Sequence, residues 1–96
     1  MDRTKILEAL KQYKKTSQEK YEIVKIGLFG SLARGEAGTH SDVDIVIILK
    51  KQDLFNIIGI KQELEEELHA SVDVISYRET MNPFLKQRID EEAVYV

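Results

Sequence analysis

The spacing of apolar residues along the chain predicts helices that alternate with strands. In two long segments, apolar side chains recur three or four positions apart, which is typical of a helix with one buried face. The first helix is expected from about Arg3 to Gln18 and the second from about Leu54 to His69. Asp2 and Asp53 stand directly before these helices, where an aspartate can cap the free N–H groups of the first turn.

Three runs rich in β-branched residues predict strands at residues 23–29, 42–49 and 72–77. Asn82-Pro83 predicts the start of a last helix that runs to about Glu92, because proline fits the first helical position. The apolar tail, residues 93–96, is a candidate edge strand. The helix between the second and third strands is long enough for a crossover that lays these strands side by side. This alternation alone permits either a small mixed sheet or a small doubly wound domain.

Composition and charge favour some classes of protein over others. A chain of 96 residues is long enough for one modest core, so we expect a single domain over residues 1–96. The net charge of −3 argues against general nucleic-acid binding, which usually requires a basic surface. The chain has no cysteine for a disulfide or a thiolate metal site. No apolar stretch is long enough for a membrane span and no signal peptide is evident, so we expect a cytoplasmic protein with no membrane partner.

The end of the first strand carries a candidate phosphate site. A strand that stops at Gly30-Ser31 and opens into a short helix, expected over residues 31–36, leaves backbone N–H groups that favour an anion. Gly30 has no Cβ to obstruct a phosphate, and Ser31 can cap the helix or donate its hydroxyl to the ligand. Arg34 follows one turn later, where its guanidinium suits either a phosphate or a structural bond to a carboxylate or carbonyl.

Two aspartates open the second strand. Alternate strand residues face the same way, so Asp42 and Asp44 should project from one face, about 7 Å apart along the chain. Two ionised carboxylates repel each other unless a cation lies between them, and Mg²⁺ is commonly held by one or two carboxylates with substrate phosphates. Asp73 interrupts an apolar strand, which suggests a site residue, although a solvent-facing aspartate is the alternative. The pattern predicts a metal–nucleotide site.

Three nearby features have simpler interpretations. His40, which precedes the acidic pair, is interpreted as a solvated loop residue and not as a base or ligand. Ser41 is interpreted as a turn or capping residue and not as a nucleophile, since no partnered base is evident. The acidic run at residues 63–67 is interpreted as the solvent side of a helix and not as a metal or partner site.

Gly30-Ser31, Arg34-Gly35 and Ser41-Asp42-x-Asp44 together resemble the signature of the DNA polymerase β-like nucleotidyltransferase superfamily. The form GSLARG followed by SDVDI is most similar to its minimal nucleotidyltransferase branch. Asp73 is similar in setting to the third aspartate of that family, and the resemblance covers residues 23–77. It implies an α/β fold in which a small mixed β-sheet carries the site on one edge and helices cover its other surface.

The resemblance also implies a reaction, in which a nucleoside monophosphate passes from a nucleoside triphosphate such as ATP to a hydroxyl group. Asp42 and Asp44 would hold two Mg²⁺ ions, and Asp73 would complete one shell and help to deprotonate the acceptor. Gly30 and Ser31 would hold the β and γ phosphates, and Arg34 is a candidate nucleotide contact.

Minimal nucleotidyltransferases are commonly paired with HEPN-domain ribonuclease toxins, so the resemblance implies an antitoxin that adenylylates a tyrosine of its toxin. One alternative is a non-catalytic antitoxin or nucleotide-sensing subunit that inhibits its partner by binding. The other is a nucleotidyltransferase subunit that acts on a small molecule. Three aspartates weigh against a pure binder, and the lack of room for an acceptor domain weighs against the small-molecule enzyme.

Overall fold

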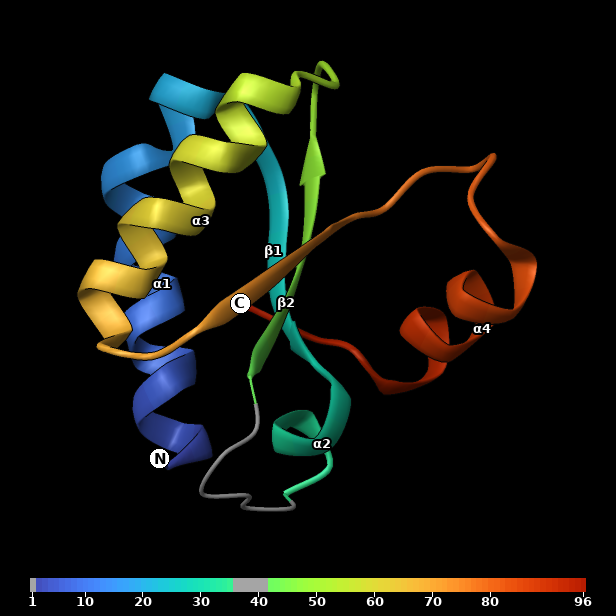
Figure 1. Cartoon of the computed structure of the whole chain (residues 1–96), viewed down its shortest axis with the longest axis horizontal. Coiled ribbons are helices and arrows are strands. Elements are labelled where there is room, and N and C mark those ends of the chain that lie inside the picture. The colour runs from blue at the N-terminus through green and yellow to red at the C-terminus, as the bar shows by residue number, and fades with distance from the viewer. Residues whose placement is uncertain (1, 36–41) are drawn as a thin grey trace.

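The computed structural model describes residues 2–35 and 42–96, and its elements follow the predicted order (Figure 1). In chain order they are α1 (Arg3–Tyr21), β1 (Ile23–Phe29), α2 (Gly30–Ala33), β2 (Val43–Leu49), α3 (Leu54–Leu68), β3 (Val72–Ser76), α4 (Pro83–Glu92) and β4 (Val94–Tyr95).

Two helices differ in length from their predictions. The buried stripe of α1 continues through Ser17 and Tyr21, so the helix ends three residues later than the apolar pattern indicated. The prediction stopped early because Ser17 is polar and therefore does not register in an apolar pattern. The short helix α2 ends at Ala33 and not at residue 36, because Gly35 has a φ of +79°, which a right-handed helix does not allow.

The sheet is mixed, as expected, with the strand order β3-β2-β1-β4. β1 is antiparallel to both β2 and β4, whereas β2 and β3 are parallel and connected by α3. The apolar tail therefore forms the predicted edge strand, and it pairs with Gly27 and Leu28 of β1. Gly27 permits this close pairing, because a Cβ there would lie 2.7 Å from the carbonyl oxygen of Val94.

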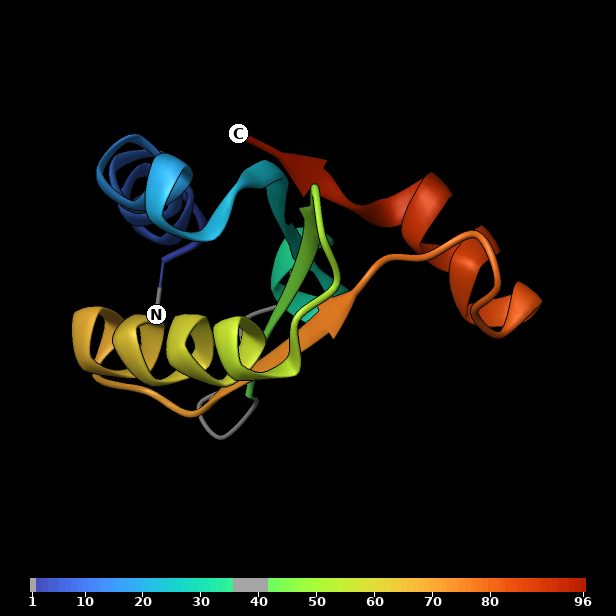
Figure 2. The same cartoon turned by 90° about the horizontal axis from the view of Figure 1, so that it is seen from above.

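The helices cover the two faces of the sheet unequally (Figure 2). α1 and α3 lie on one face, over a core that includes Ile45 and Ile47 of β2. α4 packs on the other face, where Ile89 contacts Phe29 and Val46. The strand alternation of β2 explains this division, because successive side chains point to opposite faces. Among the described residues, no helix is long and apolar enough to cross a membrane.

A polar network on Glu63 connects α1 to α3. The Glu63 carboxylate accepts hydrogen bonds from the Tyr13 and Tyr21 hydroxyls at 2.9 and 2.5 Å, and from the Lys20 ammonium group at 3.3 Å. Glu65 accepts the backbone N–H of Val72 at 3.1 Å and so links α3 to β3. The prediction that the whole acidic run faces solvent was therefore wrong for these two residues. Glu63 bonds to residues of α1 that lie 42 to 50 positions away, and the Glu65 contact with Val72 forms only where the end of α3 meets β3.

The Glu63 network predicts a pH-dependent contribution to stability. Burial alone would raise the pKa of Glu63, but the hydrogen bonds from Tyr21, Tyr13 and Lys20 outweigh it and hold the pKa below its ordinary value of 4.5. The unfolded chain therefore binds this proton more readily, so the network's contribution is present above pH 4.5 and is lost as the pH falls through the folded-state pKa.

We expect Glu63→Gln to lower the free energy of unfolding by about 1 kcal/mol at pH 7, the usual net effect of a partly exposed hydrogen-bonded charge. The matched change Glu66→Gln alters an exposed residue of the same helix and should have little effect. Urea titrations at pH 7 and pH 3 measure both, and the Glu63→Gln difference should shrink at pH 3. An equal loss at both pH values would contradict the assignment.

Candidate functional site

Asp44 and Asp73 stand side by side on neighbouring strands. The parallel register of β2 and β3 pairs their Cα positions directly, which confirms that the third strand brings its aspartate to the second. On the other side of β2, Asp44 is paired with Phe29 of β1. Since Asp44 alternates with the buried Ile45, its side chain belongs to the face that Val46 shares with α4.

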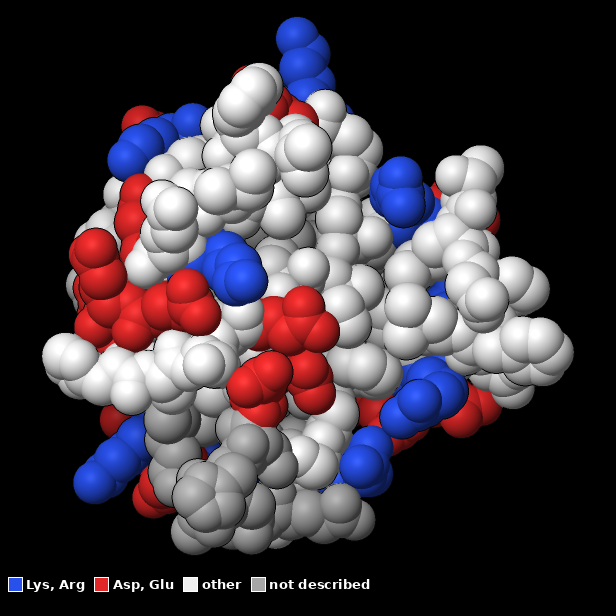
Figure 3. Space-filling view, in the orientation of Figure 1, with Lys and Arg blue, Asp and Glu red and all other residues white. Residues whose placement is uncertain are grey.

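Asp42 completes the acidic group from a position just before β2, where it is exposed. Acidic side chains gather at the centre of the face shown in the space-filling view (Figure 3). The pKa of Asp44 is raised, first by partial burial and then by the charges of Asp73 and Asp42, while the Arg34 charge opposes the shift. The three carboxylates and one guanidinium therefore lie close enough to influence one another's charge.

Gly30 lies against Asp44. Its φ is +77°, and a Cβ at this position would collide with Asp44 Oδ2 and would lie 3.2 Å from Asp44 Cγ. Glycine is thus required for two reasons, the left-handed backbone and the close approach of the carboxylate. The partly buried Ser31 follows it in α2. The structure therefore places the predicted phosphate segment directly beside the predicted metal ligand.

The donor set suits Mg²⁺ shared with a substrate. In the described part of the chain, no three His, Asp or Glu side chains are arranged to hold a metal ion by themselves. Asp42, Asp44 and Asp73 offer only carboxylate oxygens, which are hard ligands that Mg²⁺ accepts. Because Mg²⁺ usually completes its shell with water and substrate phosphates, two or three carboxylates beside a phosphate site fit this ion, whereas an all-protein cage does not.

Arg34 makes the structural bond that the sequence left open. Its Nη1 donates to Glu92 Oε1 of α4 at 2.6 Å. Its charge nevertheless acts on the site, because it lowers the pKa of Asp44 against the effect of the other carboxylates. A role in binding phosphate and a bond to Glu92 are therefore compatible at this position. His40 and Ser41 lie outside the described residues.

Two residues near the site were missed in the sequence. Arg88 donates from Nε to Glu92 Oε2 at 3.4 Å, and its guanidinium carbon lies 5.7 Å from the centre of the Phe29 ring. The i, i+4 spacing of Arg88 and Glu92 was a visible signal for this pair on one helix face. The contact between Glu92 and Arg34 spans 58 residues and leaves no trace in local spacing.

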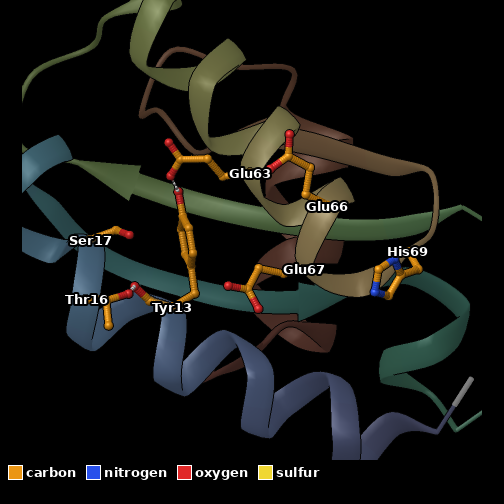
Figure 4. A pocket seen from close by; sticks show the side chains of 7 residues that line it. All are labelled: Tyr13, Thr16, Ser17, Glu63, Glu66, Glu67 and His69. Atoms are coloured by element: carbon orange, nitrogen blue, oxygen red, sulfur yellow. Dashed lines mark hydrogen bonds between the residues drawn. The ribbon is translucent and has the colours of Figure 1, made fainter.

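A polar hollow of about 370 Å³ lies between α1 and α3 (Figure 4). These helices cover the face of the sheet opposite to the side chain of Asp44. The residues that line it are Tyr13, Thr16, Ser17, Glu63, Glu66, Glu67 and His69. The Tyr13 hydroxyl, which points across this hollow, is already bonded to Glu63 (Figure 4). The bond between Tyr13 and Glu63 stabilises the contact between the two helices, and the hollow is separate from the acidic site.

Comparison with known proteins identifies the family. The model of the family described as polymerase beta nucleotidyltransferase matches residues 10–96. A protein of Methanocaldococcus jannaschii, named as a protein adenylyltransferase, is 35% identical over 94 residues, covering 97% of this chain and 96% of the relative. The protein adenylyltransferase MntA of Thermococcus cleftensis is 33% identical over 88 residues, covering 91% of this chain and 88% of that one.

Solved structures have the same fold. A minimal nucleotidyltransferase superposes with a TM-score of 0.79 at 30% identity, covering 98% of this chain and 95% of its own. A complex of a tri-AMPylated HEPN toxin with its MNT antitoxin from Shewanella oneidensis gives a TM-score of 0.58 at 21% identity, covering 88% and 69% of the two chains. At that identity the second likeness shows the fold alone.

The sheet order, the paired aspartates beside Gly30 and the family match over residues 10–96 agree with one another. This chain is a nucleotidyltransferase that belongs to the polymerase β-like family, and its relatives are named protein adenylyltransferases.

Proposed function

We propose that this enzyme transfers AMP from ATP to a tyrosine hydroxyl of a HEPN-domain ribonuclease toxin, and that it acts as the antitoxin of that toxin. The observation that carries the proposal is the direct pairing of Asp44 with Asp73 beside Gly30. The names of the relatives supply the adenylyl group and the protein acceptor. The Shewanella complex supplies the class of partner, since its HEPN toxin carries AMP and its MNT antitoxin shares this fold.

Each site residue has a role in this reaction. Asp42 and Asp44 would hold two Mg²⁺ ions, with Asp73 joining one of them. The chemistry that such ions supply is neutralisation of phosphate charge and polarisation of the acceptor oxygen. Gly30 and Ser31 would bind the β and γ phosphates, and Asp73 would accept the proton of the tyrosine hydroxyl. The tyrosine oxygen then attacks the α phosphorus, the bond from that phosphorus to the bridging oxygen breaks, and pyrophosphate leaves.

The crowding of carboxylates favours this catalytic role over inhibition by binding alone. Partial burial beside Asp73 and Asp42 raises the pKa of Asp44, which means that its charged form is disfavoured in the metal-free protein. A protein that only covers its partner has no use for such repulsion. An enzyme that binds cations with its nucleotide needs such a cluster, because the carboxylates hold the cations and the bound cations relieve the repulsion.

The proposed transfer is tested by incubating the protein, Mg²⁺ and α-labelled ATP with a HEPN-domain toxin from the same genome. We expect label on a toxin tyrosine, and we expect Asp44→Asn to reduce the rate at least about 100-fold, as loss of a group that acts in the transition state does. Asp53→Asn is the matched control, because it removes one negative charge while asparagine can still cap α3. If Asp44→Asn no longer labels the toxin but still protects cells as fully as wild type does, inhibition is steric.

Metal dependence is tested by thermal melts in EDTA and in Mg²⁺. Without metal, Asp44→Asn should be more stable than wild type by roughly 0.5–2 kcal/mol, the range of typical single-site effects, because it removes one of three repelling charges. Mg²⁺ should stabilise wild type more than Asp44→Asn, since the ion binds the folded site. A lower melting temperature for Asp44→Asn in EDTA, together with no response of either protein to Mg²⁺, would exclude a shared metal site.

The packing of Gly30 on Asp44 is tested with a pair of glycine variants. Gly30 and Gly35 have φ angles of +77° and +79°, so alanine introduces similar backbone strain at both. Only at Gly30 does the new Cβ meet Asp44, whereas at Gly35 no atom of the described residues, apart from its chain neighbours, lies within 4 Å. We therefore expect Gly30→Ala to lose at least about tenfold more kcat/KM than Gly35→Ala, because displacement of a catalytic carboxylate is costly. Equal losses would mean that backbone strain alone is responsible.

A further inference from the structure

Glu92 lies at the end of α4 and connects that helix to the phosphate segment. One carboxylate oxygen accepts from Arg34 at 2.6 Å and the other accepts from Arg88 at 3.4 Å. Hydrogen bonding by Arg34 and then by Arg88 lowers the pKa of Glu92 in spite of its burial penalty. The Glu92 side chain is 22% exposed, whereas Arg34 and Arg88 are 40% and 57% exposed. The ionised carboxylate of Glu92 therefore binds two arginines and is less exposed to solvent than either of them.

Arg88 fixes Glu92 from the side of the sheet. Its guanidinium carbon lies 5.7 Å from the centre of the buried Phe29 ring, so a cation–π contact restricts the Arg88 side chain. Phe29 is the β1 partner of Asp44, which places this contact next to the acidic site. The i, i+4 bond from Arg88 then restricts Glu92 within α4.

Arg34 lies between Glu92 and the site. Its backbone N–H donates to the carbonyl of Gly30 at 3.2 Å, and Gly30 packs on Asp44. Its guanidinium charge is also felt at Asp44. A triphosphate bound at Gly30 and Ser31 would bring its terminal phosphates, which carry most of its charge, to this end of the segment. Since a guanidinium has five N–H donors, it can contact a carboxylate and a phosphate together.

We propose that Glu92 is a positioning residue for nucleotide binding, which holds Arg34 where its guanidinium meets the terminal phosphates of ATP. An exposed arginine samples many rotamers and loses that freedom when it binds a ligand. A carboxylate that restricts it beforehand reduces this loss. The proposal rests on the nucleotide site of the proposed function and adds to it a residue from α4, the helix that packs on the same face of the sheet.

The experiment measures binding of ATP and of AMP to the protein in Mg²⁺ by isothermal titration calorimetry. For Glu92→Gln we expect about fivefold weaker ATP binding, the scale of a loosened charged contact, and unchanged AMP binding, because AMP lacks the terminal phosphates. Glu92→Asp should recover part of the loss. Glu91→Gln is the matched control, since Glu91 is the next residue, is exposed, and accepts a bond from Gln87 within the same helix.

A double variant tests whether Glu92 acts through Arg34. In the Arg34→Ala background, Glu92→Gln should cause no further loss of ATP affinity, because the group that it positions is gone. Additive losses, an equal loss for AMP, or a lower melting temperature with unchanged ATP affinity would each overturn the proposal. Wild type that binds ATP but does not label a toxin would refute the proposed transfer alone, and these binding results would still decide the role of Glu92.

Discussion

The parallel pairing of β2 with β3 is the constraint on which the site depends. It places Asp44 directly opposite Asp73, although they are 29 positions apart in the chain, by the difference of their residue numbers. The connection through α3 makes this register possible, because a parallel pair needs a long crossover. α3 is in turn held to α1 by Glu63 and to β3 by Glu65. The acidic side chains on one face are thus positioned by helix contacts on the other.

The same pairing brings like charges together, and the rest of β2 offsets the cost. Val43, Ile45, Val46 and Ile47 are all buried, so the strand that carries Asp44 is anchored in the core from both faces. Repulsion between carboxylates in this setting cannot be relieved by a shift of the strand, because a one-residue slip would turn its buried residues to the wrong face. The negative charge of the clustered aspartates must therefore be balanced by Arg34 and by ligands that bind the folded state.

Most of the fold could be predicted from the sequence because local signals mark its elements. Caps at Asp2 and Asp53, Pro83 at a helix start and β-branched runs each indicate a boundary without distant contacts. Asp42, Asp44 and Gly30 were recognised as candidates because their spacing in one short segment predicts a metal–nucleotide site. Glu63 and Glu92 were not, because each obtains its role from partners more than 40 positions away. A carboxylate in an acidic helix has the same local pattern whether it faces solvent or an arginine.

The placement of α4 explains how the candidate site fits on so small a sheet. α1 and α3 cover one face completely enough to bury Ile26, Ile45 and Ile47, so that face can supply most of the core. On the other face, α4 packs over a smaller core around Phe29 and Val46, and the strand ends with Asp44 and Asp73 remain beside it. The chain then returns through β4 to pair with β1, which fixes the end of α4 against the sheet. α4 therefore buries the second core and also brings Glu92 to Arg34. The same helix thus determines both the packing and the placement of charge on this face.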